Sequence, residues 1–151
     1  MSEYLIQIIA AVFSAIGFSL LFNIHGKKLF ITGFGGAVTW GVYILVYIQT
    51  GNVFMACFVA TMAIMAFAEI MARVAKTPVI ILLVPMLIPM VPGGDLYRMM
   101  TNLVMDNSEQ ASFYGYQLLM EVGAIAFGII VISTIMQLIL KMHAHLTGAH
   151  R

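Results

Sequence analysis

Long apolar runs separated by short polar stretches dominate this chain. Residues 4–22, 29–48, 53–72 and 116–140 each form a run close to the ~20 residues that a helix needs to cross the hydrocarbon of a bilayer. One further run begins near Val79. The pattern predicts an all-α fold, a polytopic membrane helix bundle with five transmembrane segments in one membrane domain over residues 1–151.

Composition indicates that lipid is the solvent. The chain is 62% hydrophobic and 9% charged, whereas soluble domains are about 45–50% apolar and roughly 25% charged. No basic patch with interleaved aromatics is present, which argues against a nucleic-acid partner. Cys57 is the only cysteine, so an intrachain disulfide framework is impossible. Glu3 and the lack of a basic leader predict that the first run stays as a span rather than a removable signal peptide.

The fourth run is interrupted by residues that break helices. Pro85, Pro89 and Pro92 remove backbone donors, and Gly93 and Gly94 loosen the chain directly afterwards. A broken backbone at membrane depth is tolerated only where protein or a watery cavity satisfies the freed groups. Such breaks mark binding sites in transporters. We therefore expect the fourth segment to be broken at Pro92-Gly93-Gly94 and to border a site.

Charge decides how this short segment crosses. As a helix, residues 79–91 rise only ~20 Å, so they either cross together with a second half-helix over about residues 94–105 or re-enter on the same side. If all five segments cross, only Arg98 lies opposite the other basic residues, which are Lys27, Lys28, Arg73, Lys76, Lys141 and Arg151. The positive-inside rule then predicts a bacterial cytoplasmic-membrane protein with its N-terminus outside and its C-terminus inside.

The break offers hydrogen-bond donors and an acid together. If a half-helix starts near Gly94, its first amides lack intrahelical partners and suit a carboxylate. Asp95 either caps these amides itself or binds an ammonium group, and Tyr97 lies on the next turn. The candidate substrate-binding residues are thus Pro92, Gly93, Gly94, Asp95 and Tyr97, and an α-amino acid would suit them. The alternative is a proline kink that serves packing and binds nothing.

Two other polar residues each have two interpretations. Glu69 lies inside the third run, where a carboxylate is costly and could carry a coupling proton; it also lies four residues before Arg73, the spacing of an interfacial ion pair. Asn23 ends the first run, as a helix C-cap or as a substrate ligand. Glu121 near the outer end of the fifth run is interpreted as an interfacial acid or a site residue.

Small residues recur at four-residue spacing in two of the runs. Gly33, Ala37 and Gly41 do so in the second run, and Ala124 and Gly128 in the fifth. Such faces let helices approach closely in lipid. The pattern leaves open whether the partner helix lies in the same chain or in another subunit.

The chain resembles the threonine/serine exporter family through two motifs. The first runs from Gly17-Phe18 to Phe22-Asn23, and the second is Ile88-Pro89-Met90-Val91-Pro92-Gly93 followed by Tyr97. Nearly the whole chain is similar to the small membrane subunit, the equivalent of the C-terminal half of single-chain exporters. Asn23, Pro89, Pro92, Gly93 and Tyr97 match the family's motif positions, whereas Asp95 is not assumed to follow its pattern.

The resemblance implies export of small hydroxy amino acids driven by the proton motive force, together with a larger membrane subunit. A related pair in the family implies a dicarboxylate such as succinate as the alternative cargo. From the residues alone, a structural subunit that binds no substrate stays open, as does self-association. No phosphate loop, zinc spacing or nucleophile motif occurs, so we expect no enzyme activity, metal or cofactor.

Overall fold

The computed structural model describes residues 2–146, and within them the fold is entirely helical. The elements are α1 (Ser2–Leu21), α2 (Lys27–Thr50), α3 (Val53–Val74), α4 (Val79–Leu87), the 3₁₀ turn η1 (Ile88–Met90), α5 (Gly93–Val104) and α6 (Ser108–Leu146). The prediction of an all-α fold is confirmed.

Four of these helices are long and apolar enough to cross a membrane, namely α1, α2, α3 and α6. A fifth crossing results if α4 with η1 and α5 form one span, which is bent by 53° between its two halves. The structure thus has the four to five candidate spans that the apolar runs predict, with the fourth of them broken.

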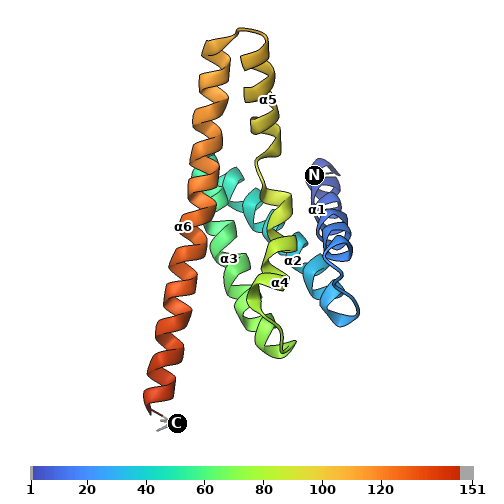
Figure 1. Ribbon diagram of the computed structural model, residues 1–151, viewed down its shortest axis with the longest axis vertical. Coiled ribbons are helices and arrows are strands. Elements are labelled where there is room, and N and C mark those ends of the chain that lie inside the picture. The colour runs from blue at the N-terminus through green and yellow to red at the C-terminus, as the bar shows by residue number, and fades with distance from the viewer. Residues whose placement is uncertain (1, 147–151) are drawn as a thin grey trace.

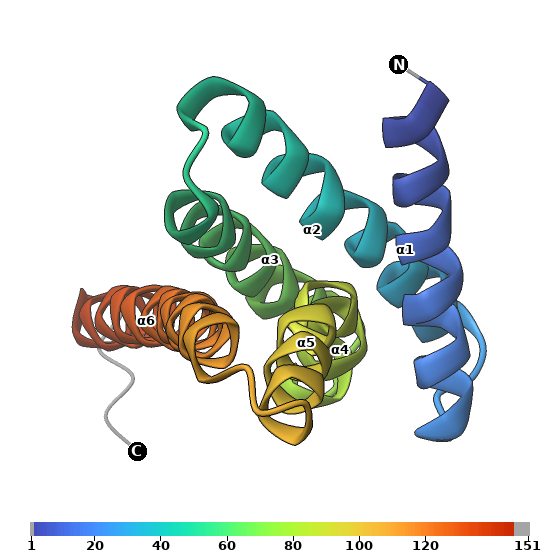
Figure 2. The same cartoon turned by 90° about the horizontal axis from the view of Figure 1, so that it is seen from above.

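The helices form an arc around the broken segment. Consecutive pairs α1–α2 and α2–α3 pack together, α6 closes onto α3, and α4 packs against α1, α2 and α3. Seen from above, α4 and α5 lie on the concave side of this arc (Figure 2). In Figure 1, α5 and the first part of α6 extend as a hairpin beyond the ends of the other helices. The largest core cluster lies between α3 and α4 and includes Ile64, Met65, Leu82 and Met86.

Glycines in α2 and α6 set how closely the helices approach. A β-carbon on Gly35 would overlap the Met86 side chain of α4, and one on Gly36 would lie 2.8 Å from the Ala11 carbonyl oxygen of α1. On Gly128 it would lie 2.8 Å from Thr61 Cβ of α3. For these three glycines, the partner helix therefore lies in the same chain. Gly41 faces open space.

Three helices end in the same hydrogen-bonded motif without glycine. Asn23, Lys76 and Asp106 have φ of 59°, 47° and 54°, and the amide that follows each donates to the carbonyl five residues earlier, over 2.8–2.9 Å. This is the Schellman arrangement, in which asparagine is the commonest substitute for glycine. The prediction of Asn23 as a C-cap is confirmed.

The polar stretch over residues 106–112 is mostly helical, because α6 begins at Ser108. Asn107 Oδ1 accepts a hydrogen bond from the Gln110 amide at 3.4 Å, which caps the first turn. Glu109 in that turn complements the positive end of the helix dipole. Capping residues at the start of the polar stretch therefore extend the helix into it.

The break in the fourth crossing lies slightly before the position we predicted. The α-helix ends at Leu87, η1 follows, Val91 is extended, and Pro92 is the N-cap of α5. Gly93 and Gly94 are therefore the first residues of a helix rather than the loosened link. Pro85, assigned to the break, lies buried within α4, which continues through it.

We predict opposite effects of adding one methyl group at two glycines of α2. Gly36→Ala should lower the free energy of unfolding by about 1–3 kcal/mol, because the new methyl meets the α1 backbone and overpacks the contact. Gly41→Ala, the matched control, should be neutral or stabilising by up to about 1 kcal/mol through helix propensity. Thermal unfolding of the purified variants in detergent measures both, and equal effects would contradict the packing role of Gly36.

Candidate functional site

A threonine of α2 satisfies part of the broken backbone. Thr39 is fully buried, and its hydroxyl oxygen lies 2.8 Å from the Gly35 carbonyl oxygen and 3.1 Å from that of Met86. Its single proton therefore donates to one of the two carbonyls or is shared. Met86 is the residue before the last of α4, where carbonyls lose their helical partners. The hydroxyl thus fixes the end of α4 against α2.

A small cavity lies beside the break. Its volume is about 100 Å³, and its lining consists of Trp40, Tyr43, Cys57, Pro89, Met90, Val91, Pro92 and Glu121. At ~30 Å³ per water, it holds no more than a few water molecules. Among the described residues, no hydrogen bond or ion pair engages the Glu121 carboxylate. The cavity therefore combines aromatic walls with one unpaired acid.

A second cavity of about 330 Å³ lies on the other side of Trp40 and Pro89, which line both spaces. Its other lining residues come from α1 and η1: Gln7, Ala10, Ala11, Ser14 and Ile88. Trp40 Nε1 donates to Gln7 Oε1 at 3.2 Å, and the Trp40 ring stacks on Tyr43 with centroids 4.9 Å apart. The volume falls in the usual range for small-molecule sites.

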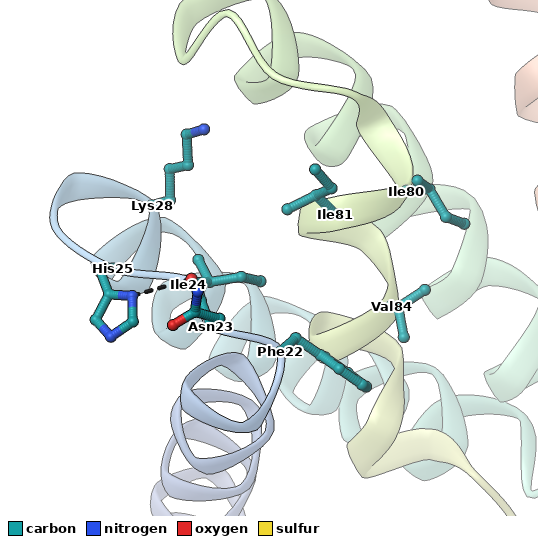
Figure 3. A pocket seen from close by; sticks show the side chains of 8 residues that line it. All are labelled: Phe22, Asn23, Ile24, His25, Lys28, Ile80, Ile81 and Val84. Carbon is teal, nitrogen blue, oxygen red and sulfur yellow. Dashed lines mark hydrogen bonds between the residues drawn. The ribbon is translucent and has the colours of Figure 1, made fainter.

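A third cavity, of about 490 Å³, lies between the end of α1, the start of α2 and the start of α4. Figure 3 shows Asn23, His25 and Lys28 on one side and Ile80, Ile81 and Val84 of α4 on the other. We call it the inner cavity, because it lies at the end of the bundle that carries the basic α1–α2 connection. None of the residues that line the other two cavities lines this one.

The structure separates the predicted site residues into two groups. Pro89 and Pro92 line the cavities at the break, and Asp95 lies in the first turn of α5, which begins there. Asp95 Oδ1 is also 3.7 Å from Arg98 Nη1. Asn23 lies away from these residues, in the inner cavity.

The remaining predicted residues are exposed or ion-paired in this chain. Gly93 and Gly94 are exposed with open space at their β-carbon positions, and Tyr97 is 72% exposed. Glu69 Oε2 lies 2.9 Å from Arg73 Nη2, so the predicted ion pair is present. Protonation of Glu69 would remove its negative charge and break this ion pair.

Sequence reasoning underrated the residues that approach the break from other helices. Glu121 carried a usable signal, since it is an acid inside an apolar run, where ionisable groups mark functional positions. Trp40, Tyr43 and Gln7 carried none, because single aromatic and polar residues are common in membrane helices. Only the packing of α1, α2 and α6 around η1 brings these four side chains to the two cavities beside the break.

The fold and the site define a helical membrane protein in which a broken crossing borders two cavities. The family model described as Threonine/Serine exporter, ThrE, matches residues 7–135. The chain therefore belongs to the threonine/serine exporter family, and its role is exporter-type transport. Comparison with curated proteins and with solved structures gives no significant match.

We predict that the Thr39 hydroxyl stabilises the broken segment. Thr39→Val keeps the shape of the side chain but removes the donor to the Met86 carbonyl, and should lower the free energy of unfolding by about 1–3 kcal/mol. Thr39→Ser keeps the hydroxyl and should lose clearly less. Thermal unfolding in detergent checks both variants, and a Thr39→Val variant as stable as the original would rule out this role.

Proposed function

We propose that this chain is one subunit of a proton-coupled secondary transporter that exports threonine, serine or a related small carboxylate. Membership of the exporter family supports the class of cargo. The observation that carries the proposal is the broken crossing, whose η1 turn separates two cavities sharing Trp40 and Pro89. Broken crossings hold substrate and coupling ions in several transporter folds.

The sizes of the two cavities suggest different occupants. The cavity beside Gln7 and Ser14 has room for a small amino acid and offers polar groups to it. The smaller cavity suits a proton carried on Glu121 with a few waters. The amides of Gly94 and Asp95 have no partner among the described residues, and such donors at a helix start suit a substrate carboxylate. Pro92, Gly93, Gly94, Asp95 and Tyr97 thus stay in the proposal.

Glu121 is a better proton carrier than Glu69 on this geometry. The Glu69 carboxylate is held by Arg73 at 2.9 Å, whereas Glu121 is unpaired among the described residues and borders the break. Tyr43 of α2 and Cys57 of α3 line the same cavity as Glu121. No lysine, arginine or histidine is among the residues that line it.

A larger membrane subunit of the same family, or a second copy of the chain, is the proposed partner. α5 buries none of its own side chains and packs mainly against α6. Its large apolar residues point to an environment of lipid or protein, because all of them except Met99 are substantially exposed: Leu96, Tyr97, Met100, Leu103 and Val104. A transport path closed by this chain alone would leave that surface uncovered.

We propose the bacterial cytoplasmic membrane as the location, with the N-terminus outside. The α1–α2 connection, the α3–α4 connection and the C-terminal end of α6 lie toward one end of the molecule, and the α5–α6 connection lies at the other (Figure 1). The first two connections carry Lys27, Lys28 and Lys76. This arrangement supports five crossings with the basic end inside.

Two alternatives keep specific support. Dicarboxylate export needs the same donors at the start of α5 and differs only in cargo. A structural subunit without a substrate site is favoured by the exposure of Gly93, Gly94 and Tyr97 in this chain.

The first test is efflux of labelled threonine, serine and succinate from cells. We expect efflux that depends on the proton gradient when this chain is expressed with the larger subunit, and little from either alone. Glu121→Gln should lower this efflux about tenfold or more. A tenfold change corresponds to ~1.4 kcal/mol, here the lost free-energy difference between the protonated and ionised forms of the side chain. Glu69→Gln is the matched control and should keep most activity.

The outcomes of this test separate the proposals. If Glu121→Gln assembles with its partner and transports normally while Glu69→Gln fails, then Glu69 carries the proton. If neither variant affects efflux, the structural alternative holds. Efflux of succinate alone identifies the dicarboxylate alternative.

Topology can be tested with single cysteines in a Cys57→Ala background. In intact cells an impermeant maleimide should label Gln49→Cys and Gln110→Cys, and it should label Thr77→Cys only after permeabilisation. These positions lie at the end of α2, the start of α6 and the α3–α4 connection. A fourth segment that re-enters would instead protect Gln110→Cys together with Thr77→Cys.

A further inference from the structure

The inner cavity has a charged side and an apolar side. Lys28 and His25 lie at the start of α2 and in the connection before it, with Asn23 beside them (Figure 3). The opposite side is formed by Ile80, Ile81 and Val84 of α4, together with Phe22. Ile24 is the remaining lining residue. No acidic residue lines the cavity. The cavity therefore presents basic side chains next to exposed apolar side chains.

The charged side has unused donors. Lys28 forms no ion pair among the described residues. His25 Nδ1 lies 2.9 Å from the Asn23 carbonyl oxygen, and since that oxygen only accepts, Nδ1 carries the hydrogen. Nε2 has no partner among the described residues and donates to an anion when it too carries a hydrogen. The start of α2 lacks a side-chain cap, so its positive dipole end adds to the field of Lys28.

The apolar side is open to a chain-like ligand. Ile80 is 60% exposed, Ile81 39% and Val84 37%, and Phe22 on the end of α1 is 52% exposed. Ile80, Ile81 and Val84 lie next to one another on α4, across the cavity from Lys28 (Figure 3). An inorganic anion or an amino acid would leave this wall uncovered, whereas an acyl chain would cover it.

The cavity is built from fixed backbone. The Schellman motif holds Asn23 at φ 59°, and Ile24, 5% exposed, anchors the connection in the core. Just behind it, the buried hydroxyls of Ser19 and Thr32 lie 2.7 Å apart and join α1 to α2. The connection that carries the charged side of the cavity is therefore held in place before any ligand binds.

We propose that the inner cavity binds one anionic phospholipid, with its phosphate at Lys28 and His25 and an acyl chain along Ile80, Ile81 and Val84. Basic pockets between membrane helices recognise such headgroups. In the orientation proposed above, the lipid belongs to the cytoplasmic leaflet. The site does not depend on the proposed cargo, since it shares no lining residue with the cavities at the break.

The test measures lipid association with the full chain in vesicles of phosphatidylcholine that contain spin-labelled phosphatidylglycerol or spin-labelled phosphatidylcholine. We expect a preference for phosphatidylglycerol that falls about fivefold in Lys28→Gln, the effect of one lysine near an anionic lipid. Lys76→Gln is the matched control, because Lys76 lies in a connection at the same end of the bundle but outside the cavity. It should keep the preference.

A second variant tests the apolar side without changing charge. Val84→Trp fills the space beside Ile80 and should weaken phosphatidylglycerol association while Lys28 is intact. Thermal unfolding in pure phosphatidylcholine verifies that each variant is folded. Equal losses in Lys28→Gln and Lys76→Gln would mean a general surface potential and overturn the proposal. Displacement of the lipid by inorganic phosphate would reduce the cavity to an anion site, and displacement by threonine or serine would make it a cargo entrance.

Discussion

The hydrogen bond from Thr39 to the end of α4 is the interaction on which the broken crossing depends. A helix that stops inside a membrane exposes carbonyls to hydrocarbon, where no water can satisfy them. Thr39 supplies a donor from the neighbouring helix, 3.1 Å from the Met86 carbonyl oxygen. Gly35, one turn away, allows the approach, because any side chain there would overlap Met86. Close packing and polar satisfaction thus come from the same turn of α2.

This arrangement explains how a small membrane chain can form cavities without losing its packing. α4 is held against α2 and α3 by a continuous apolar cluster, and the chain departs from the α-helix only over η1 and the two residues that follow. Both cavities at the break lie against η1. This departure from α-helical geometry is local, so the free-energy cost of lost backbone hydrogen bonds is confined to a few groups. A transporter that has to open and close around its cargo needs such a place, where small backbone changes alter the cavities.

Charge is used differently at the two ends of the molecule. At the basic end, Glu69 pairs with Arg73, while Lys28 has no ion-pair partner among the described residues. At the break, Glu121 lines a cavity and likewise has no partner in the part of the chain that the structure describes. Unpaired charge in a membrane protein is costly and is retained where it meets an ion, a headgroup or a cargo. Our two proposals accordingly assign the basic end to a lipid and the acidic break to transport.

The sequence by itself determined the helical class, the order of the apolar helices and the position of the break to within a turn. It also determined the cap at Asn23 and the ion pair between Glu69 and Arg73. All of these follow from local rules: hydropathy over ~20 residues, the missing donor of proline and spacing along one helix. Only the tertiary structure decided that Trp40 lies between a cavity lined by Gln7 and another lined by Glu121, while Asn23 lies in a separate cavity. The physical reason is that helix packing joins residues far apart in the chain, and in lipid the faces that pack are selected by close fit rather than by hydrophobicity.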